Sequence, residues 1–210
     1  MEQGTGQQAS ARMGRPPLTE RRKAATRLEI AQEAVRLFAA KGVAATSAEE
    51  IAQAVGISQR TLWRYFASKE QCVEPLLASG VGVLAERLRE WRPGTPLFTV
   101  GAGAGRLLTV TPEQAEALRG LIRLTRDEDG LRAVWLQVHQ QAEPVFAEAV
   151  AEGTGRGAGD LEPRVQAAMI NTALRVAVEE WAWNSADGSA AGLHAVLERA
   201  LRVAAAGLPG

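Results

Sequence analysis

The residues with the richest chemistry lie in one short stretch, GISQRTLWRYFASKE, residues 56–70. Hydrogen-bond donors alternate there with apolar side chains, and two serines stand where helices could begin. An arginine offers paired donors that fit guanine O6 and N7, and a glutamine amide fits adenine N6 and N7 in the same bidentate way. Arg60 and Gln59 therefore point to recognition of nucleic-acid base edges.

The other donors of this stretch suit a phosphate backbone, because hydroxyl, indole, phenol and ammonium groups all donate to phosphate oxygens. The residues with this predicted role are Thr61, Trp63, Tyr65 and Lys69. The residues that we expect to face bases are Gln59, Arg60, Thr61 and Arg64. A solvated helix face with ordinary core aromatics is the alternative that the pattern leaves open.

A short helix must carry these side chains, and the apolar spacing predicts which face it buries. Leu62 and Phe66 are four residues apart and so lie on one face of a helix over about 59–66, with Ser58 as its cap. The opposite face and the N-terminal tip then carry the donors. In a helix-turn-helix, the N-terminal part of the second helix meets base edges in the major groove.

Three further helices are expected around this one. Apolar spacing predicts them at about 21–40, 48–55 and 69–91. Gly42 ends the first as a left-handed C-cap, and the break at GISQ separates the second helix from the third. Either Thr46 with Glu49 or Ser47 with Glu50 forms the capping box of the second. Ser68, three residues before Gln71, is the expected cap of the last.

The segment RLEIAQEAVRLFAAKGVAATSAEEIAQAVGISQRTLWRYFASKE closely resembles the N-terminal DNA-binding domain of TetR-family bacterial repressors. The resemblance covers about residues 22–72 and rests on three elements with intact spacing. These are A..LF...G...T, then IA..VGIS, then TLWRYF.SKE. Trp63 departs from the family, which usually has tyrosine there, so donation survives with a different reach.

The resemblance implies further roles for named residues. Thr46 and Ser47, at the start of the second helix, are expected to face a phosphate. It also implies a homodimer that sets two reading helices on a palindromic operator and releases it when a small molecule binds. The domains expected are a disordered basic arm at 1–20, a helix-turn-helix domain at 21–68, a connecting helix at 69–91, and a ligand-binding and dimerisation domain at 92–210.

The N-terminal segment is rich in Gly, Gln and Pro and carries basic residues near GRPP and ERRK. An extended arginine-containing arm can lie in a narrow A·T minor groove, where negative potential is concentrated. The residues assigned to such an arm are Arg15, Arg21, Arg22 and Lys23. A disordered solubilising tail is the alternative.

Composition narrows the class of protein. The 210 residues carry 24 basic and 24 acidic side chains, but residues 1–69 hold eleven of the basic and six of the acidic ones, a local charge of +5. No apolar run reaches the roughly 18–20 residues that a membrane span needs, and the N-terminus lacks the apolar core of a secretory signal. Cys72 is the one cysteine, which excludes a disulfide framework and fits a reducing cytoplasm.

The remaining two thirds of the chain also read as helices. Ranges of about 97–108, 130–152, 160–186 and 190–206 are predicted, with another helix that Thr111 caps and Pro112 begins. With no β-alternating segment, the expected fold class is all-α with about nine helices. Pro75 and Pro144 fall inside predicted helices, where proline produces a kink or marks a misplaced boundary.

The last two helices carry apolar and small residues that suit a four-helix interface between two subunits. In the first of them the residues are Leu161, Val165, Ala168, Met169, Thr172, Val176 and Glu179; in the second they are Leu193, Val196, Leu197, Ala200, Leu201 and Ala204. The alternative is that both stripes belong to the core of one subunit.

Aromatic residues and one histidine suggest a pocket for an unknown small-molecule effector. The candidates are Trp91, Phe98, Trp135, His139, Met169 and Trp181, although aromatics at helical spacing are more often plain core. Trp135 and His139, four residues apart, should lie one above the other. Two histidines without local motifs predict neither a metal site nor a catalytic triad, and no cofactor is expected.

These patterns favour a DNA-binding transcriptional regulator that is not an enzyme. Its expected partners are a double-stranded operator, a small-molecule effector and a second copy of the chain joined through the last two helices, with no membrane. An all-helical enzyme or adaptor that uses the helix-turn-helix only for packing is the alternative.

Overall fold

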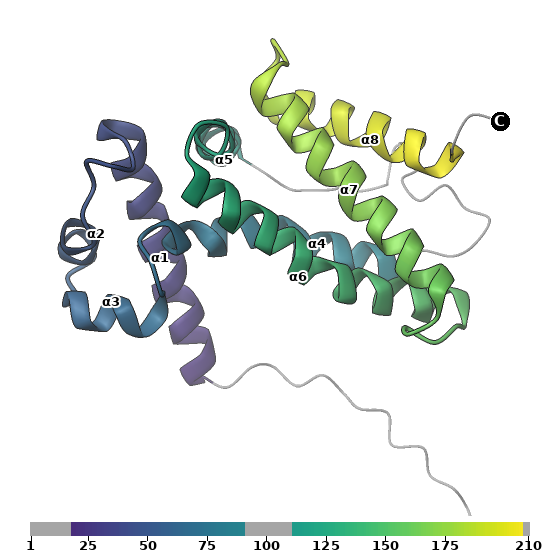
Figure 1. Cartoon of the computed structure of the whole chain (residues 1–210), viewed down its shortest axis with the longest axis horizontal. Coiled ribbons are helices and arrows are strands. Elements are labelled where there is room, and N and C mark those ends of the chain that lie inside the picture. The colour runs from purple at the N-terminus through teal and green to yellow at the C-terminus, as the bar shows by residue number, and fades with distance from the viewer. Residues whose placement is uncertain (1–17, 91–110, 208–210) are drawn as a thin grey trace, which may run out of the picture.

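A computed structural model describes residues 18–90 and 111–207, and all secondary structure in these ranges is helical (Figure 1), as expected. The elements are α1 (Leu18–Lys41), α2 (Ala48–Ala54), α3 (Gln59–Tyr65), a 3₁₀ turn η1 (Glu70–Val73), α4 (Glu74–Glu90), α5 (Pro112–Leu124), α6 (Asp129–Thr154), α7 (Leu161–Trp183) and α8 (Ala190–Ala206). The described ranges thus hold eight α-helices; the ninth expected one, at 97–108, lies outside them.

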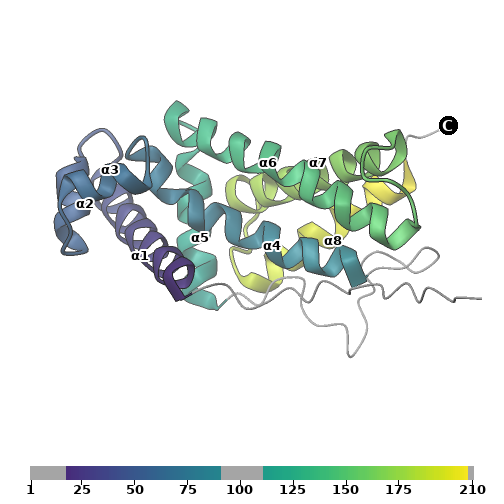
Figure 2. The ribbon, with the colours of Figure 1, turned by 90° about the horizontal axis from the view of Figure 1, so that it is seen from below.

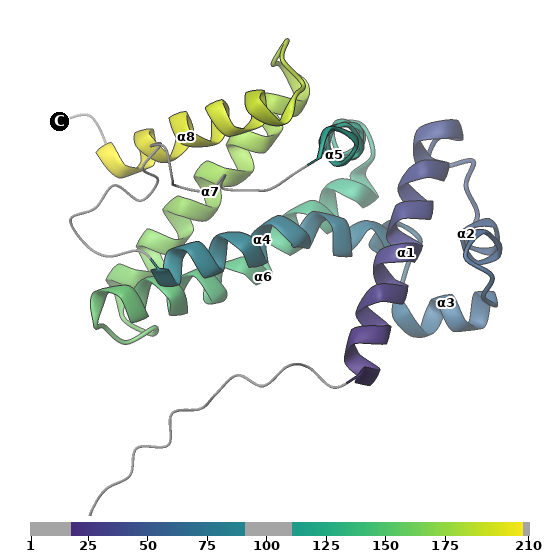
Figure 3. The ribbon, with the colours of Figure 1, turned by 180° about the vertical axis from the view of Figure 1, so that it is seen from behind.

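Helices α1–α3 form a small unit at one end of the molecule, and α7 and α8 lie at the other (Figures 1 and 2). α4 and α6 run side by side between these ends (Figures 1 and 3). α7 packs on α6 and α8, while α5 packs on α7 and reaches α1. None of the helices in the described ranges is both long and apolar enough to cross a membrane.

The capping residues explain where several helices begin. Ser47, rather than Thr46, caps α2, and its pairing with Glu50 completes a capping box. Thr111 and Gln114 form a second box, with Pro112 at the first position of α5, as predicted. Ser68 accepts a hydrogen bond from the Gln71 N–H at 3.2 Å, as expected, although it opens the 3₁₀ turn η1 rather than an α-helix.

Pro75 marks a boundary and not a kink. The expected helix over 69–91 divides into η1 and α4, and Pro75 is the second residue of α4. In the first turn of a helix the missing N–H removes no internal hydrogen bond, so proline is tolerated there. Pro144 lies inside α6, which is helical on both sides of it as far as Thr154.

Two apolar clusters make up the interior. The larger one is continuous from the α1–α3 unit into the far helices: it contains Phe38 and Leu62 as well as Leu193. The smaller one joins α4, α6 and α7 around Leu88 and Phe146. The α1–α3 unit therefore shares its core with the rest of the protein.

The outer side of α7 carries an apolar stripe, spaced at four, four and seven residues. Its members are Leu161, Val165, Met169 and Val176, which are 69%, 47%, 41% and 48% exposed. The apolar stripe expected on the last helix is not exposed in the same way: Leu193, Leu197 and Leu201 of α8 are buried within the same chain. Val203 remains exposed on α8.

Candidate nucleic-acid interface

Helix α3 is seated on the α1–α3 unit by two side chains. Leu62 is fully buried and Phe66 is nearly so, which fixes the inner face of α3. The Ser58 hydroxyl accepts a hydrogen bond from the Thr61 N–H at 3.2 Å and so begins the helix. The spacing of these three residues in the sequence predicted this arrangement.

The outer face and the tip of α3 carry most of the residues expected to face bases. Gln59, Arg60 and Arg64 are exposed. Thr61 is half-buried, and its hydroxyl lies 2.9 Å from that of Ser58, so it takes part in the cap. The Arg64 guanidinium lies 5.6 Å from the centroid of the Tyr65 ring, which is a cation–π distance.

Among the residues assigned to phosphates, Ser47, Trp63 and Tyr65 reach the surface, while Thr46 does not. Trp63 is 43% exposed and Tyr65 is half-buried. Thr46 is 1% exposed, and its hydroxyl donates to the carbonyl of Gly42 at 2.8 Å. The expected phosphate contact of Thr46 is therefore wrong: this hydroxyl satisfies a carbonyl at the end of α1.

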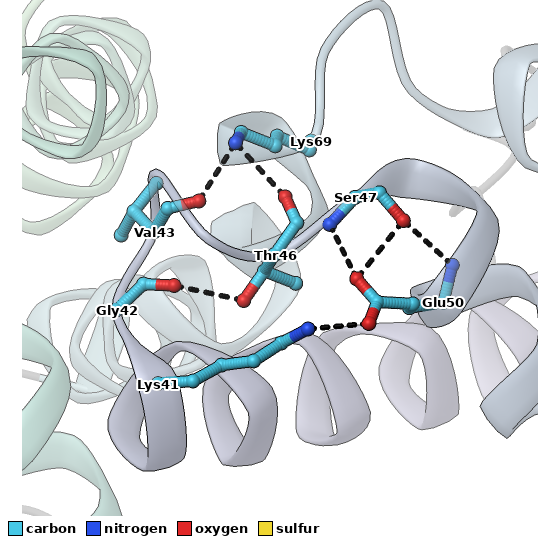
Figure 4. A network of polar contacts seen from close by, with 7 residues as sticks. All are labelled: Lys41, Gly42, Val43, Thr46, Ser47, Glu50 and Lys69. Atoms are coloured by element: carbon cyan, nitrogen blue, oxygen red, sulfur yellow. Dashed lines mark hydrogen bonds and ion pairs between the residues drawn. The ribbon is translucent and has the colours of Figure 1, made fainter.

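Lys69 has a structural role that the sequence did not predict. Its ammonium donates to the carbonyls of Val43, at 2.7 Å, and Thr46, at 2.9 Å (Figure 4). An ammonium has three protons, so two of them are committed to the loop between α1 and α2. Lys69 thus holds this loop against the start of η1, and the phosphate contact predicted for its third proton stays a prediction.

The same loop is fastened on its other side by a carboxylate (Figure 4). Glu50 accepts hydrogen bonds from Lys41, at the end of α1, and from the backbone N–H of Ser47 at 2.8 Å. The hydrogen bond from Lys41 first, and then those from Ser47, lower the pKa of Glu50 to about 2. The end of α1 and the start of α2 are therefore joined through an ionised carboxylate.

Arg27 is a positioning residue that the sequence reasoning missed. Its guanidinium donates to the Tyr65 carbonyl at 3.3 Å and to the Glu74 carboxylate at 2.8 Å, and it lies 4.8 Å from the centroid of the Phe66 ring. It joins α1 to the end of α3 and the start of α4. A signal existed in its spacing, because Arg27 lies three residues before the buried Ile30 on the inner face of α1.

The basic arm is helical over its described part. Arg21, Arg22 and Lys23 belong to the first turns of α1, which begins at Leu18, and Lys23 pairs with Glu20 at 2.9 Å. These three residues are exposed, but they do not form the extended strand expected of a minor-groove arm. Arg15 lies outside the described residues.

Two of the six pocket candidates lie together. Trp135 and His139 are both buried in α6, with ring centroids 4.2 Å apart and edge-to-face. Trp181 is fully buried elsewhere, beneath Arg119, and Met169 is 41% exposed on the outer side of α7. Trp91 and Phe98 lie outside the described residues.

Two hollows lie away from the side chains of these candidates. One of about 450 Å³ is lined by Pro112, Glu116, Arg119, Gly120, Arg123 and Gly188. A smaller one, of about 140 Å³, lies between η1 and α6 and is lined by Gln71, Glu74, Val134, Gln137, Val138 and Gln141. Neither of these two hollows is lined by Trp135, His139, Met169 or Trp181, so the aromatic pocket stays a prediction.

Comparisons with known proteins agree with this geometry. Residues 30–76 match the family model described as bacterial regulatory proteins, tetR family, and residues 101–209 match that of the MftR C-terminal domain. The HTH-type transcriptional regulator TcmR of Streptomyces glaucescens is 33% identical over 196 residues, which cover 89% of this chain and 85% of TcmR.

Two further proteins are similar to this chain, one in part of its sequence and one in its fold. The HTH-type transcriptional repressor KstR2 of Mycolicibacterium smegmatis is 41% identical over 61 residues, or 29% of this chain and 30% of KstR2. The crystal structure of the TetR family repressor AlkX of Dietzia sp. has the same fold, with a TM-score of 0.50 and 19% identity over 85% of this chain and 96% of AlkX. These relatives are transcriptional regulators and not enzymes, as the sequence predicted.

Lys69→Met should lower the free energy of unfolding, because the variant keeps the aliphatic stem but leaves the Val43 and Thr46 carbonyls without their charged donor. We expect a loss of about 1–3 kcal/mol in urea denaturation. Lys41→Met is the matched control, since it removes an ammonium from the exposed Glu50 pair, and its effect should be smaller. An equal loss in both variants contradicts the clamp role of Lys69.

Glu50→Gln should alter the dependence of stability on pH. The pKa of Glu50 falls from about 4.5 to about 2 on folding, so its contribution is full above the unfolded value and is lost as the pH drops through the folded one. At pH 6 the variant should melt below the wild type, and the gap should close between about pH 4.5 and 2. Thermal melts across this range check it; a constant gap contradicts it.

Proposed function

This chain belongs to the TetR family of bacterial transcriptional regulators, and we propose that it is a repressor that leaves a near-palindromic operator when a small molecule binds its C-terminal domain. The observation that carries the DNA contact is the exposed tip of α3, where Gln59 and Arg60 stand on a helix held by the buried Leu62. The similarity of 61 residues of the chain to the repressor KstR2 supports the direction of regulation. Because its target is chromosomal DNA, we expect the protein in the bacterial cytoplasm.

A homodimer supplies the second reading helix. The exposed apolar stripe of α7 (Leu161, Val165, Met169 and Val176) is the surface that we assign to the partner, together with the exposed Val203 of α8. A two-fold axis through this stripe puts the same patch of both subunits in contact. The two copies of α3 then enter successive major grooves, roughly 34–36 Å apart, which is why the operator should be palindromic.

Helix α6 and the turn η1 offer a route from the effector to α3. Gly130, near the start of α6, lies so close to Glu70 of η1 that a Cβ placed on it would be 2.8 Å from the glutamate Cγ. η1 directly follows Lys69, which holds the α1–α2 loop. A shift of α6 therefore presses on η1 and tilts the α1–α3 unit. An effector drives this shift only if it binds the two arrangements with different affinity.

In this proposal the chain is divided by role. Residues 21–68 read DNA, residues 69–91 connect, and residues beyond 92 bind the effector and the second subunit. Ser47, Trp63 and Tyr65 contact phosphates. Arg21, Arg22 and Lys23, in the first turns of α1, lie near the backbone of the duplex.

Selection of bound duplexes from a random pool tests the DNA contact. Wild-type protein should select half-sites one helical turn apart, with affinity that falls steeply as salt rises. Arg60→Ala should weaken binding to the selected site by about 1–3 kcal/mol and relax the base preference at one position of each half-site. The control is Arg36→Ala, an exposed arginine of α1 paired with Glu33, which should leave affinity and preference unchanged. Equal effects of the two substitutions, or binding insensitive to salt, contradict the interface.

Val165→Glu should separate the subunits, because it places a carboxylate in the middle of the apolar stripe of α7. Sedimentation should show a dimer for the wild type and a monomer for the variant, with loss of operator binding at concentrations where the wild type is saturated. Val83→Glu, at a valine of α4 that is 43% exposed and outside the stripe, should remain dimeric. A dimeric Val165→Glu protein excludes this face as the interface.

A further inference from the structure

One ring nitrogen of His139 is buried without a hydrogen-bond partner, which is unusual in a protein interior. The side chain is 8% exposed, and its Nε2 atom is buried with no hydrogen-bond partner. A buried polar atom without a partner loses its hydration and gains nothing in return, so native proteins contain few of them. Where one occurs beside a fully bonded network, a missing partner is the simplest physical account.

The network around His139 decides which group is missing. Asn171 of α7 donates through its Nδ2 to the His139 carbonyl at 2.8 Å and to Glu143 at 3.4 Å, so its Oδ1 faces the His139 Nδ1 at 2.7 Å. An amide oxygen only accepts, and the proton therefore sits on Nδ1. In the neutral ring Nε2 then holds a lone pair, which requires a donor.

The neutral form is the one that this environment favours. Burial lowers the pKa of His139, because a charged imidazolium would lose its hydration there. Asn171 is itself 3% exposed and fixed on both sides, so the ring cannot turn without breaking its bonds. The lone pair is thus held in one direction, away from α7.

Trp135 forms one wall of the site and is held as firmly as the histidine. Its Nε1 donates to Glu179 of α7 at 2.9 Å, and both carboxylate oxygens of Glu179 accept from Arg175, at 3.0 and 2.9 Å. The arginine is therefore neutralised by its partner. With Glu143 and Glu179 both nearby, the site offers nothing to an anion.

His139 and Asn171 lie where the two apolar clusters meet. Along α6 the larger cluster ends at Val138 and the smaller one begins at Ala142. Val81 of α4 and Leu174 of α7 contact both clusters and are only partly buried. The two clusters thus meet at this level of α4, α6 and α7, where Val81 and Leu174 are partly exposed to solvent.

We propose that the effector enters at this level and donates a hydrogen bond to Nε2 of His139. The effector is a neutral, mainly apolar molecule with one hydroxyl or N–H group; its body lies against Trp135, Val81 and Leu174. This inference rests on the proposed function, since it describes the molecule that a ligand-responsive regulator senses.

The test uses full-length protein with ¹⁵N-labelled histidine. The chain has only two histidines, so His194→Gln identifies the ring signals of His139. Three matched pairs serve as probes, each a donor and its methylated analogue: 2-naphthol and 2-methoxynaphthalene, indole and 1-methylindole, 1-octanol and 1-methoxyoctane. At least one donor should shift the Nε2 resonance in the direction of an accepted hydrogen bond, and its analogue should bind about tenfold more weakly.

His139→Leu fills a similar volume without an acceptor, so the difference between donor and analogue should vanish in it. If that variant does not fold, the wild-type pairs decide alone. The inference is overturned if no donor moves the Nε2 resonance, if donor and analogue bind equally, or if the unliganded resonance already reports a hydrogen bond that a bound probe leaves unchanged, as for a fixed water molecule.

Operator binding measured on the same sample separates the two proposals. Salt-dependent binding to the selected duplex without any response of His139 overturns only this inference. A response of His139 in a protein that binds no duplex overturns only the proposed function.

Discussion

The loop between α1 and α2 depends on the ammonium group of Lys69. The carbonyls of Val43 and Thr46 face a cation supplied from the far side of α3, 26 and 23 residues later in the chain. This contact closes the α1–α3 unit into a ring of elements, with Arg27 as a second fastening between α1 and α4. Together with the buried Leu62 and Phe66, these two cations set the orientation of α3 and so of the side chains on its tip.

The order of the helices and the starts of several of them could be predicted, because local sequence patterns encode them. Ser58, Leu62 and Phe66 specify a cap and a buried face within nine residues, and Thr111 with Pro112 does the same for α5. The hydrogen-bond partners of long polar side chains could not be predicted from local patterns. The sequence offers Lys69 as a donor, but a phosphate oxygen and a loop carbonyl are equally good acceptors for it, and only the fold brings Val43 within reach. Thr46 was misassigned for the same reason.

The C-terminal helices α6 and α7 show the same limit of prediction from sequence. Trp135 and His139 are four residues apart and were expected to be neighbours, and they are. Asn171, which fixes the tautomer of the histidine, lies 32 residues away on another helix, and no local pattern connects the two. Met169 was named both for the pocket and for the interface stripe, and it is 41% exposed, because helical spacing alone does not say which side of a helix faces the core.

The larger apolar cluster crosses from Phe38 to Leu193 without a break. The α1–α3 unit and the helices that follow it are therefore not independent domains, and we expect them to unfold together. An excised N-terminal fragment would expose the apolar surface that packs against α5 and α6, and it would aggregate. The two parts are coupled through this continuous packing. A displacement at one end must change the packing at the other, because no flexible linker separates them.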